Sequence, residues 1–144
     1  MTDVMNILSI DYGEKRIGFA IGDTERKIPN PLQVIQNNSI VSIIEEIKKI
    51  VLSYNVEKIV IGIPLNEDST IGDQSNIVKE FSLIIEKELN IDVIGVDERF
   101  SSVDAEKLLL EQDMSRKKRK KIIDALAASI ILQRYFENDD LVNI

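Results

Sequence analysis

Short apolar runs of the kind that form β-strands dominate the first third of the chain. Ile7–Ile10 and Ile17–Ile21 are rich in β-branched residues, and the polar segment Tyr12–Arg16 between them suits a tight turn. Gly13 in this turn is expected to adopt a positive φ. A third run, Leu32–Ile35, follows turn-forming residues. The pattern predicts a meander of three antiparallel strands.

Further along the chain, apolar residues recur every three or four positions, which is the spacing of an amphipathic helix. Four helices are predicted in this way, over about 40–54, 77–89, 101–112 and 115–136. Asn38 or Ser39 can cap the first of them, and Ser115 can cap the last. We expect Tyr54 and Phe81, together with the isoleucines of the first two helices, to lie in the core.

Two runs between the helices, Ile59–Ile63 and Val93–Val96, are apolar throughout. Central parallel strands that are covered on both faces have this composition. The sequence therefore predicts one α/β domain, whose mixed sheet combines an antiparallel meander with parallel strands and carries helices on both faces. We place this domain at residues 1–138 and expect the acidic segment 139–144 to be a frayed tail.

The chain contains neither cysteine nor histidine, which excludes several kinds of site. Disulfides, thiolate or histidine metal sites and a Ser-His-Asp triad are ruled out, so any catalysis must use Asp, Glu, Lys, Ser or Tyr. No apolar run approaches the ~20 residues that span a bilayer, and the first residues lack the basic start of an export signal. We therefore expect a cytoplasmic protein without a membrane partner.

The basic residues are unevenly distributed in a chain whose net charge is −7. Six of the 18, Arg116–Lys121, are consecutive, whereas the rest of the chain carries 12 basic and 25 acidic residues. Such a concentrated segment favours local binding of an anion, although a solvated helix face would look the same. It also stands at the predicted start of a helix, where positive charges oppose the helix dipole and a bound phosphate would relieve the conflict.

Acidic residues stand where two of the predicted strands end. Asp11 follows the first strand, and Asp97 and Glu98 follow the last. Because ligands of open α/β sheets bind beyond the carboxyl ends of the strands, these side chains could share one edge of the sheet. Acidic residues are also common turn formers, so their positions alone do not decide between a site and a turn.

Asp124 lies in an almost entirely apolar segment, Ile122–Leu132. A helix that is apolar on all sides is buried, and a buried carboxylate costs several kcal/mol unless it is paired or bound to a cation. Ala127 and Ala128 share its face and would permit a close approach to the sheet. The alternative to a cation is pairing with a lysine one turn earlier in the same helix.

If Asp11, Glu98 and Asp124 converge, their repulsion requires a divalent cation. Two carboxylates ~4 Å apart repel by about 4 kcal/mol at an effective dielectric constant of about 20. Oxygen ligands select Mg²⁺ or Mn²⁺ over zinc, and such ions activate water and stabilise the leaving oxygen in phosphodiester hydrolysis. These residues therefore predict a metal-dependent nuclease, with the number of ions left open.

Four segments match the motifs of a known family in order and spacing. They are Ile10–Gly18, Gly62–Asn66 with Gly72 and Gln74, Val96–Ser102, and Ile123–Ala128. Over nearly its whole length the chain resembles the YqgF (RuvX) family of pre-16S ribosomal RNA nucleases, which is related to Holliday junction resolvases. The resemblance implies a ribonuclease H-like fold and a cytoplasmic bacterial nuclease that matures the 5′ end of 16S ribosomal RNA, with ribosomal particles as further partners.

By the same resemblance, Asp11, Glu98 and Asp124 correspond to the acidic metal-binding set. Successive strand residues point to opposite faces, so only one of two adjacent acids can face the metal; we favour Glu98 and keep Asp97 as the alternative. Nucleic-acid contacts are expected from Lys15, Arg16, Arg99, Arg116, Lys117, Lys120 and Lys121. Aromatic residues make up only 5% of the chain, which favours recognition of backbone and shape over base stacking.

Other functions remain open at the level of the sequence. A nuclease of the same mechanism could act on branched DNA rather than on structured RNA. The segment Asp11–Gly13 also resembles the phosphate-binding hairpin of actin-like and sugar-kinase folds, which need two such domains to close on ATP. A third alternative is a catalytically idle factor that binds ribosomal RNA or protein through its basic helix.

Overall fold

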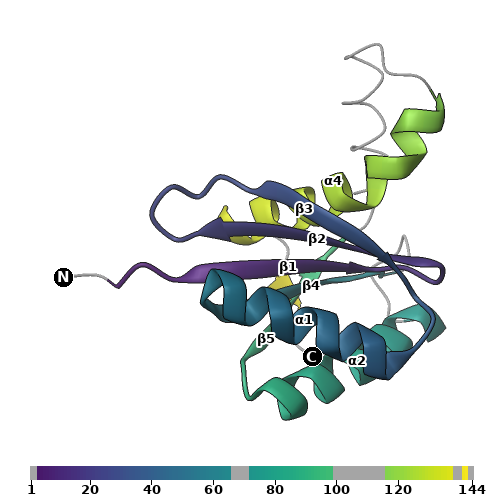
Figure 1. The fold of residues 1–144 in the computed structure, drawn as a ribbon, viewed down its shortest axis with the longest axis horizontal. Helices are drawn as coiled ribbons and strands as arrows, with labels where there is room; N and C mark the ends of the chain where they lie inside the picture. The colour runs from purple at the N-terminus through teal and green to yellow at the C-terminus, as the bar shows by residue number, and fades with distance from the viewer. Residues whose placement is uncertain (1–2, 66–71, 99–115, 138–140, 143–144) are drawn as a thin grey trace.

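The computed structural model describes residues 3–65, 72–98, 116–137 and 141–142, with only the backbone described for 116–122 and 141–142. These residues form a six-stranded mixed sheet in the order β3-β2-β1-β4-β5-β6 (Figure 1). The strands are β1 (Asn6–Tyr12), β2 (Arg16–Asp23), β3 (Asn30–Gln36), β4 (Val56–Ile63), β5 (Val93–Asp97) and β6 (Leu141–Val142). The helices are α1 (Ile40–Tyr54), α2 (Asp73–Leu89) and α4 (Arg116–Phe136).

The strand directions agree with those predicted from the sequence. β1 pairs antiparallel with β2, and β2 with β3, which confirms the meander. β1 pairs parallel with β4, and β4 with β5. The carboxyl ends of these three central strands therefore lie at the same edge of the sheet.

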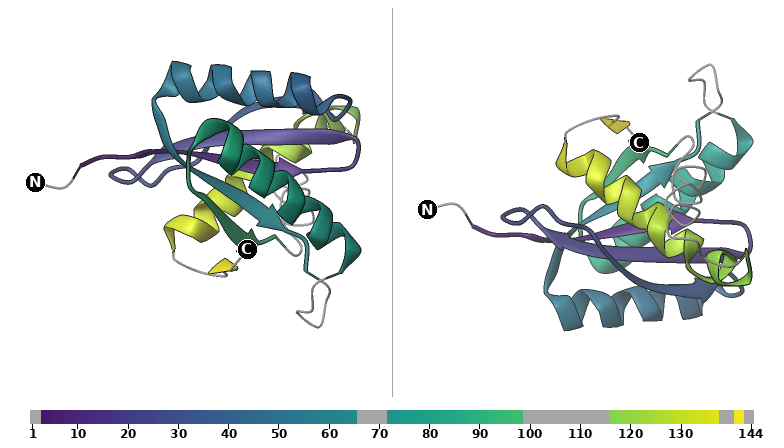
Figure 2. Two further views of the ribbon diagram at one scale, coloured as in Figure 1. Left: turned by 90° about the horizontal axis from the view of Figure 1, so that it is seen from below. Right: turned by 90° about the horizontal axis from the view of Figure 1, so that it is seen from above.

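Helices cover both faces of the sheet, as predicted. α1 and α2 lie on one face and α4 crosses the other (Figure 2). The larger core, under α1 and α2, includes Leu8 and Ile10 of β1. The smaller core, under α4, joins Ile7 of β1 to Ile131 and Leu132. Alternate residues of β1 thus face opposite layers, with the odd-numbered ones toward α4.

A serine caps the start of α1, and an asparagine ends each of α1 and α2. Ser39 caps α1, because its Oγ accepts a hydrogen bond from the N–H of Ser42 at 3.4 Å. Ser39 is one of the two residues that the sequence offered as this cap. Asn55 and Asn90 adopt the left-handed conformation directly after α1 and α2, with φ of 51° and 54°. Asparagine tolerates this conformation, so both helices end there.

Several residues that the helical spacing assigned to the core lie at the surface. Tyr54 is 42% exposed, so its prediction as a core residue is wrong, whereas Phe81 is buried. Ile40 of α1 and Ile77 and Ile84 of α2 are 43%, 47% and 41% exposed. Each helix packs on the sheet through a narrow stripe, so apolar residues beside that stripe face solvent.

The β1–β2 turn needs a glycine for a reason other than the predicted one. No described glycine has a positive φ, so that prediction is wrong for Gly13. The Gly13 N–H donates to the carbonyl of Arg16 at 3.0 Å, and a Cβ at position 13 would lie 2.5 Å from that oxygen. The close approach of two backbone segments therefore excludes a side chain.

Part of the acidic tail belongs to the sheet. Residues 141 and 142 form β6, which pairs antiparallel with β5, so the expectation of fraying is wrong for these two residues. β6 covers part of an edge of β5 that would otherwise be open. The helix predicted over 101–112 lies outside the described residues. No helix in the described part of the chain is long and apolar enough to cross a membrane.

Candidate active site

Asp11 lies near the end of β1, at the edge where the parallel strands end. As an odd-numbered residue it belongs to the α4 side of the strand, like Ser9. Ser9 is fully buried, and its Oγ donates to the carbonyl of Ala128 at 2.6 Å, which ties α4 to β1 beside Asp11. Asp11 is only 8% exposed, so its carboxylate has lost most of its water.

Glu98 follows β5 directly and reaches Asp11 across β4, the strand between them. Its N–H donates to the carbonyl of Ile63 at 3.2 Å, which extends the β4–β5 pairing by one residue. A Cβ at Gly62 of β4 would lie 2.7 Å from Oε2 of Glu98 and 2.5 Å from Cδ1 of Ile131. The missing side chain at position 62 therefore makes the space that Glu98 occupies.

Burial raises the pKa of both carboxyl groups, which share a side-chain hydrogen bond. For Asp11, burial raises the pKa, the hydrogen bond from Glu98 lowers it, and the negative charge of Asp124 raises it. The pKa of Glu98 is raised well above its ordinary value by burial and then by Asp11, while Arg134 lowers it and Asp97 raises it. The hydrogen bond thus favours the ionised form of Asp11 and the protonated form of Glu98.

Asp124 is held by an arginine from the opposite end of the chain. Arg16 is the first residue of β2, and its Nε donates to Oδ2 of Asp124 at 2.8 Å. The side chain of Asp124 is 18% exposed and that of Arg16 is 43% exposed. The sequence suggested a cation or a nearby lysine as partner for Asp124 but did not suggest this arginine.

Gly18 allows α4 to lie against β2 at this point. A Cβ at position 18 would overlap the carbonyl group of Asp124. Gly18 is the register partner of Asp11 in the neighbouring strand, so this contact places Asp124 beside Asp11. Ala127 and Ala128 are fully buried, which confirms the predicted close approach of the helix to the sheet.

A second arginine, Arg134 of α4, lies on the Glu98 side of the Asp11–Glu98 pair. Its Nη1 donates to the backbone carbonyl of Asp97 at 2.7 Å, and its charge favours the ionised form of Glu98. Sequence reasoning missed Arg134; the available signal was a basic residue in the last turn of a largely apolar helix. Of the two adjacent acids, Glu98 hydrogen-bonds to Asp11, and Asp97 is buried at the end of β5.

The three predicted acids lie in one region, but they do not form a closed cluster. Among the described residues, no group of three or more acidic, cysteine or histidine side chains is arranged to hold a metal ion. Asp11 and Glu98 form a hydrogen-bonded pair, and Asp124 acts on Asp11 through its charge while it binds Arg16. Their role as metal ligands therefore stays a prediction.

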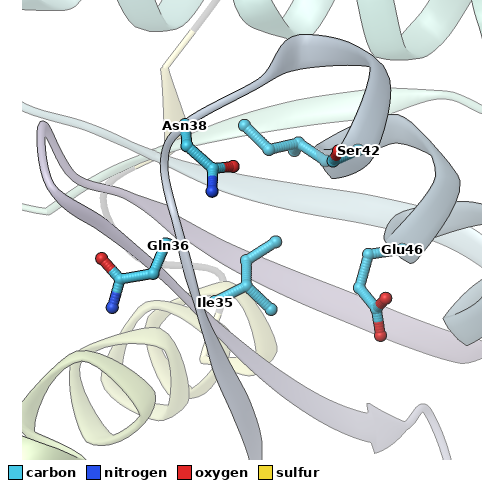
Figure 3. A pocket seen from close by; sticks show the side chains of 6 residues that line it. Ile35, Gln36, Asn38, Ser42 and Glu46 are labelled. Carbon is cyan, nitrogen blue, oxygen red and sulfur yellow. The ribbon is translucent and has the colours of Figure 1, made fainter.

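A separate hollow of about 290 Å³ lies between the end of β3 and α1. Figure 3 shows that Gln36, Asn38, Ser42 and Glu46 line it. It contains a single ionisable group and none of the predicted site residues. We therefore place the candidate active site at the Asp11–Glu98 pair.

Comparison with known proteins agrees with the resemblance noted in the sequence. The family model described as "RuvX: Holliday junction resolvase" matches residues 5–138. The chain belongs to the RuvX family. A RuvX relative from Caldanaerobacter subterraneus subsp. tengcongensis, named "Putative pre-16S rRNA nuclease", is 43% identical over 135 residues, or 93% of this chain and 97% of the relative. A relative of the same name from Carboxydothermus hydrogenoformans is 44% identical over 131 residues, or 91% and 95%. The expectation of a phosphodiester-hydrolysing nuclease is confirmed.

Solved structures confirm the ribonuclease H-like fold of this RuvX chain. T. thermophilus RuvC in complex with Holliday junction substrate aligns with a TM-score of 0.60 and 14% identity, over 96% of this chain and 99% of RuvC. The Fowlpox virus resolvase in complex with Holliday junction DNA aligns with a TM-score of 0.58 and 15% identity, over 93% and 98%. At these identities the likeness shows the fold alone.

The basic residues expected to bind nucleic acid are described only in part. Lys15 and Arg16 are exposed in the turn next to the acids. Arg99 lies outside the described residues. The side chains of Arg116, Lys117, Lys120 and Lys121 also lie outside them. The backbone of this basic run forms the first turns of α4, and Figure 1 shows that end of the helix projecting from the rest of the molecule.

The donor chemistry of the carboxyl pair fits a hard divalent cation. Asp11 and Glu98 offer carboxylate oxygens, and burial disfavours the ionisation of both. A divalent cation favours the ionised form of both groups and so fits this pair. Asp11 and Glu98 would hold such a cation, with Asp124 next to them.

Proposed function

We propose that this protein is a divalent-metal-dependent nuclease that matures the 5′ end of pre-16S ribosomal RNA. The observation that carries the proposal is the hydrogen-bonded pair of the buried Asp11 and the partly buried Glu98 at the carboxyl edge of the sheet, with Asp124 beside it. Relatives more than 40% identical over nearly their whole length bear the pre-16S nuclease name. Precursor ribosomal RNA and assembling ribosomal particles would be its partners, and it would act in the cytoplasm.

Asp11, Glu98 and Asp124 would be the metal ligands and thereby the catalytic acids. A bound Mg²⁺ or Mn²⁺ would supply Lewis-acid stabilisation of charge on the reacting phosphate and lower the pKa of a bound water. Asp11 belongs to β1 and Glu98 directly follows β5, and their mutual hydrogen bond orients their carboxyl groups before substrate arrives. Arg134 favours the ionised form of Glu98 that a cation requires.

Recognition of the substrate would come from the basic residues around this edge. Lys15 and Arg16 stand exposed at the site, and the basic run Arg116–Lys121 begins α4. Positive side chains bind phosphates without reading sequence, and the scarcity of aromatic residues gives little basis for stacking on bases. We expect recognition of a structured RNA by its backbone and shape.

The test is cleavage of a labelled pre-16S leader RNA in Mg²⁺ or Mn²⁺, beside a labelled four-way DNA junction. Asp11→Asn, Glu98→Gln and Asp124→Asn should each lower the cleavage rate by at least about 10²-fold, as expected when a charge-stabilising group is lost. Asp92→Asn, an exposed acid elsewhere in the chain, is the matched control and should cleave normally. Full activity in Asp11→Asn would refute the proposed site.

The same assay separates the two substrate classes. The family description names a Holliday junction resolvase, which favours branched DNA as the second candidate. Cleavage of the junction in preference to the leader RNA would replace the RNA assignment while leaving the acidic site in place. Binding of the RNA without cleavage in either metal would favour a non-catalytic factor.

A further inference from the structure

The Arg16–Asp124 ion pair connects solvent with the interior of the candidate site. The Arg16 side chain is 43% exposed at the start of β2, whereas that of Asp124 is 18% exposed and raises the pKa of Asp11 through its charge. In this ion pair, Arg16 is accessible to a phosphate, and Asp124 lies close enough to Asp11 to act on it by charge.

Of the two arginines that the structure describes at this site, Arg16 has the acceptor that a substrate group can replace. Arg134 is partly buried and donates to the backbone carbonyl of Asp97, an acceptor fixed at the end of β5. Arg16 instead donates to a side-chain carboxylate at a partly hydrated position. A guanidinium can bind a phosphate through two parallel hydrogen bonds, and a phosphate that binds the Nε edge of Arg16 competes with Asp124 for that donor.

Asp124 can respond to this exchange by a small movement. Its backbone carbonyl packs against Gly18, and four residues further along α4 the carbonyl of Ala128 accepts from the buried Ser9. The helix is thus fixed to the sheet on this face. A change of partner by Asp124 therefore has to come from its side chain, because this contact and this hydrogen bond hold the helix in place.

We propose that Arg16 is a positioning residue that couples phosphate binding to completion of the metal site. In the free protein Arg16 holds Asp124, which leaves the two-carboxyl pair of Asp11 and Glu98. When a substrate phosphate takes the guanidinium, Asp124 joins that pair and a third ligand is supplied. The inference rests on the proposed metal-dependent function and adds a sequence of events to it. Substrate binds first, and the full metal site forms once the substrate is present.

Such coupling must be reciprocal. If RNA tightens the binding of Mn²⁺ by a given factor, Mn²⁺ tightens the binding of RNA by the same factor. We expect a factor of about 10, within the range of roughly 5–150 that is usual for coupled sites. The electrostatic attraction between RNA phosphates and Mn²⁺ also produces coupling, so a useful test must separate the two causes.

The experiment measures Mn²⁺ affinity by electron paramagnetic resonance, with and without a phosphorothioate-linked RNA hairpin that gel electrophoresis shows to remain intact. Titration of the hairpin alone corrects for Mn²⁺ bound by RNA. The variants are Arg16→Gln, which removes the ion pair, and Arg16→Lys, which keeps the charge but not the planar fork. Arg26→Gln, in the exposed turn before β3, is the matched control.

Arg16→Gln without RNA should bind Mn²⁺ more tightly than the wild type, by about 3- to 10-fold, and the hairpin should add little further. Arg26→Gln should show the wild-type coupling factor. General electrostatics predicts instead that the hairpin tightens Mn²⁺ binding equally in Arg16→Gln and in the wild type. That result, or the absence of coupling in the wild type, would overturn the inference.

Asp11→Asn separates failure of the inference from failure of the proposed function. If Asp11→Asn binds Mn²⁺ as the wild type does, the metal site itself is wrong and the role of Arg16 is wrong with it. If Asp11→Asn loses Mn²⁺ while Arg16→Gln keeps the full coupling, the metal site stands and only the role of Arg16 is refuted.

Discussion

At the scale of single residues, the Asp11–Glu98 pair contains two acids whose simultaneous ionisation is disfavoured. Burial raises both pKa values; the charge of Asp11 raises that of Glu98 further, and the charge of Asp124 raises that of Asp11. A site of this kind reduces stability when its cation is absent, because the folded chain confines like charges that the unfolded chain separates. Stability measurements can therefore detect metal binding independently of cleavage.

Asp11→Asn should stabilise the metal-free protein and abolish its response to Mg²⁺. The amide removes one charge and can donate a hydrogen bond to Glu98, so we expect a gain of about 1 kcal/mol, or roughly 3 °C in Tm. Wild-type protein in Mg²⁺ at ten times its Kd should gain about 1.4 kcal/mol. Thermal unfolding with EDTA or Mg²⁺ measures both effects, with Asp92→Asn as control. A Mg²⁺-dependent gain in Asp11→Asn equal to that of the wild type would contradict the assignment.

The same pair makes stability depend on pH in a defined direction. The folded chain keeps the Glu98 proton above 4.5, the ordinary pKa of a glutamate, while the unfolded chain loses it. The contribution to stability is therefore complete below that pH and is lost as pH rises through the raised pKa of the folded state. Urea unfolding in EDTA across this range should show the decline, and Glu98→Gln should flatten it. A stability that rises with pH over the same window, unchanged in Glu98→Gln, would show the opposite linkage.

Gly62→Ala should displace Glu98 with only a moderate loss of stability. The added Cβ would lie 2.7 Å from Oε2 of Glu98, so the carboxyl group has to move. We expect a loss of about 1–3 kcal/mol from overpacking and of about 10²-fold in cleavage rate from misplacement of the group. Gly22→Ala, where the Cβ would lie 3.0 Å from the carbonyl of Ile28, is the matched control in β2 and should retain activity. Equal activity in the two variants would show that Gly62 does not position Glu98.

At the scale of elements, α4 carries Asp124 to β1 and Arg134 to the end of β5. Its approach depends on Gly18, because a Cβ there would meet backbone rather than a movable side chain. Gly18→Ala should therefore cost about 3 kcal/mol in the free energy of unfolding, at the upper end for overpacking, since the whole helix has to shift. Urea unfolding measures this cost, and Gly22→Ala should lose less. A loss below about 0.5 kcal/mol in Gly18→Ala would mean that α4 is not held by this contact.

The strands and the helices common to sequence and structure were predictable because their spacing is local. The alternation in β1 and the stripes of α1 and α2 are read from neighbouring residues, and so is the cap at Ser39. Contacts between distant segments were not readable in this way. The Arg16–Asp124 pair and the contact of Gly18 with α4 depend on the register of β2 and on the path of α4.

The candidate acids show the same division between local and distant information. Their positions at strand ends and in an apolar helix marked Asp11, Glu98 and Asp124 individually. Their mutual arrangement required the structure, in which Asp11 and Glu98 are hydrogen-bonded and Asp124 forms an ion pair with Arg16. β6 escaped prediction because a two-residue strand has too short a pattern to be read and depends on the edge offered by β5.

At the scale of the whole molecule, one third of the basic residues are concentrated where α4 projects from an otherwise acidic body. Arg116–Lys121 contributes six of the 18 basic residues in a chain of net charge −7 (Figure 1). Attraction of a polyanion by the molecule as a whole is therefore weak, and binding has to depend on local contacts. Each phosphate neutralised by a lysine releases bound counterions, so the number of such contacts appears in the salt dependence of affinity.

Replacing Lys120 and Lys121 by alanine should weaken RNA binding uniformly and reduce the slope of log K against log salt by roughly 1–2. The matched control is the double replacement of Lys48 and Lys49, two exposed lysines of α1, on the face of the sheet opposite α4, which should leave the slope unchanged. Fluorescence anisotropy of a labelled leader RNA between about 50 and 200 mM salt measures both slopes. If the two double variants give the same slope, the basic run is a solvated helix face, and binding rests on the turn that holds Lys15 and Arg16.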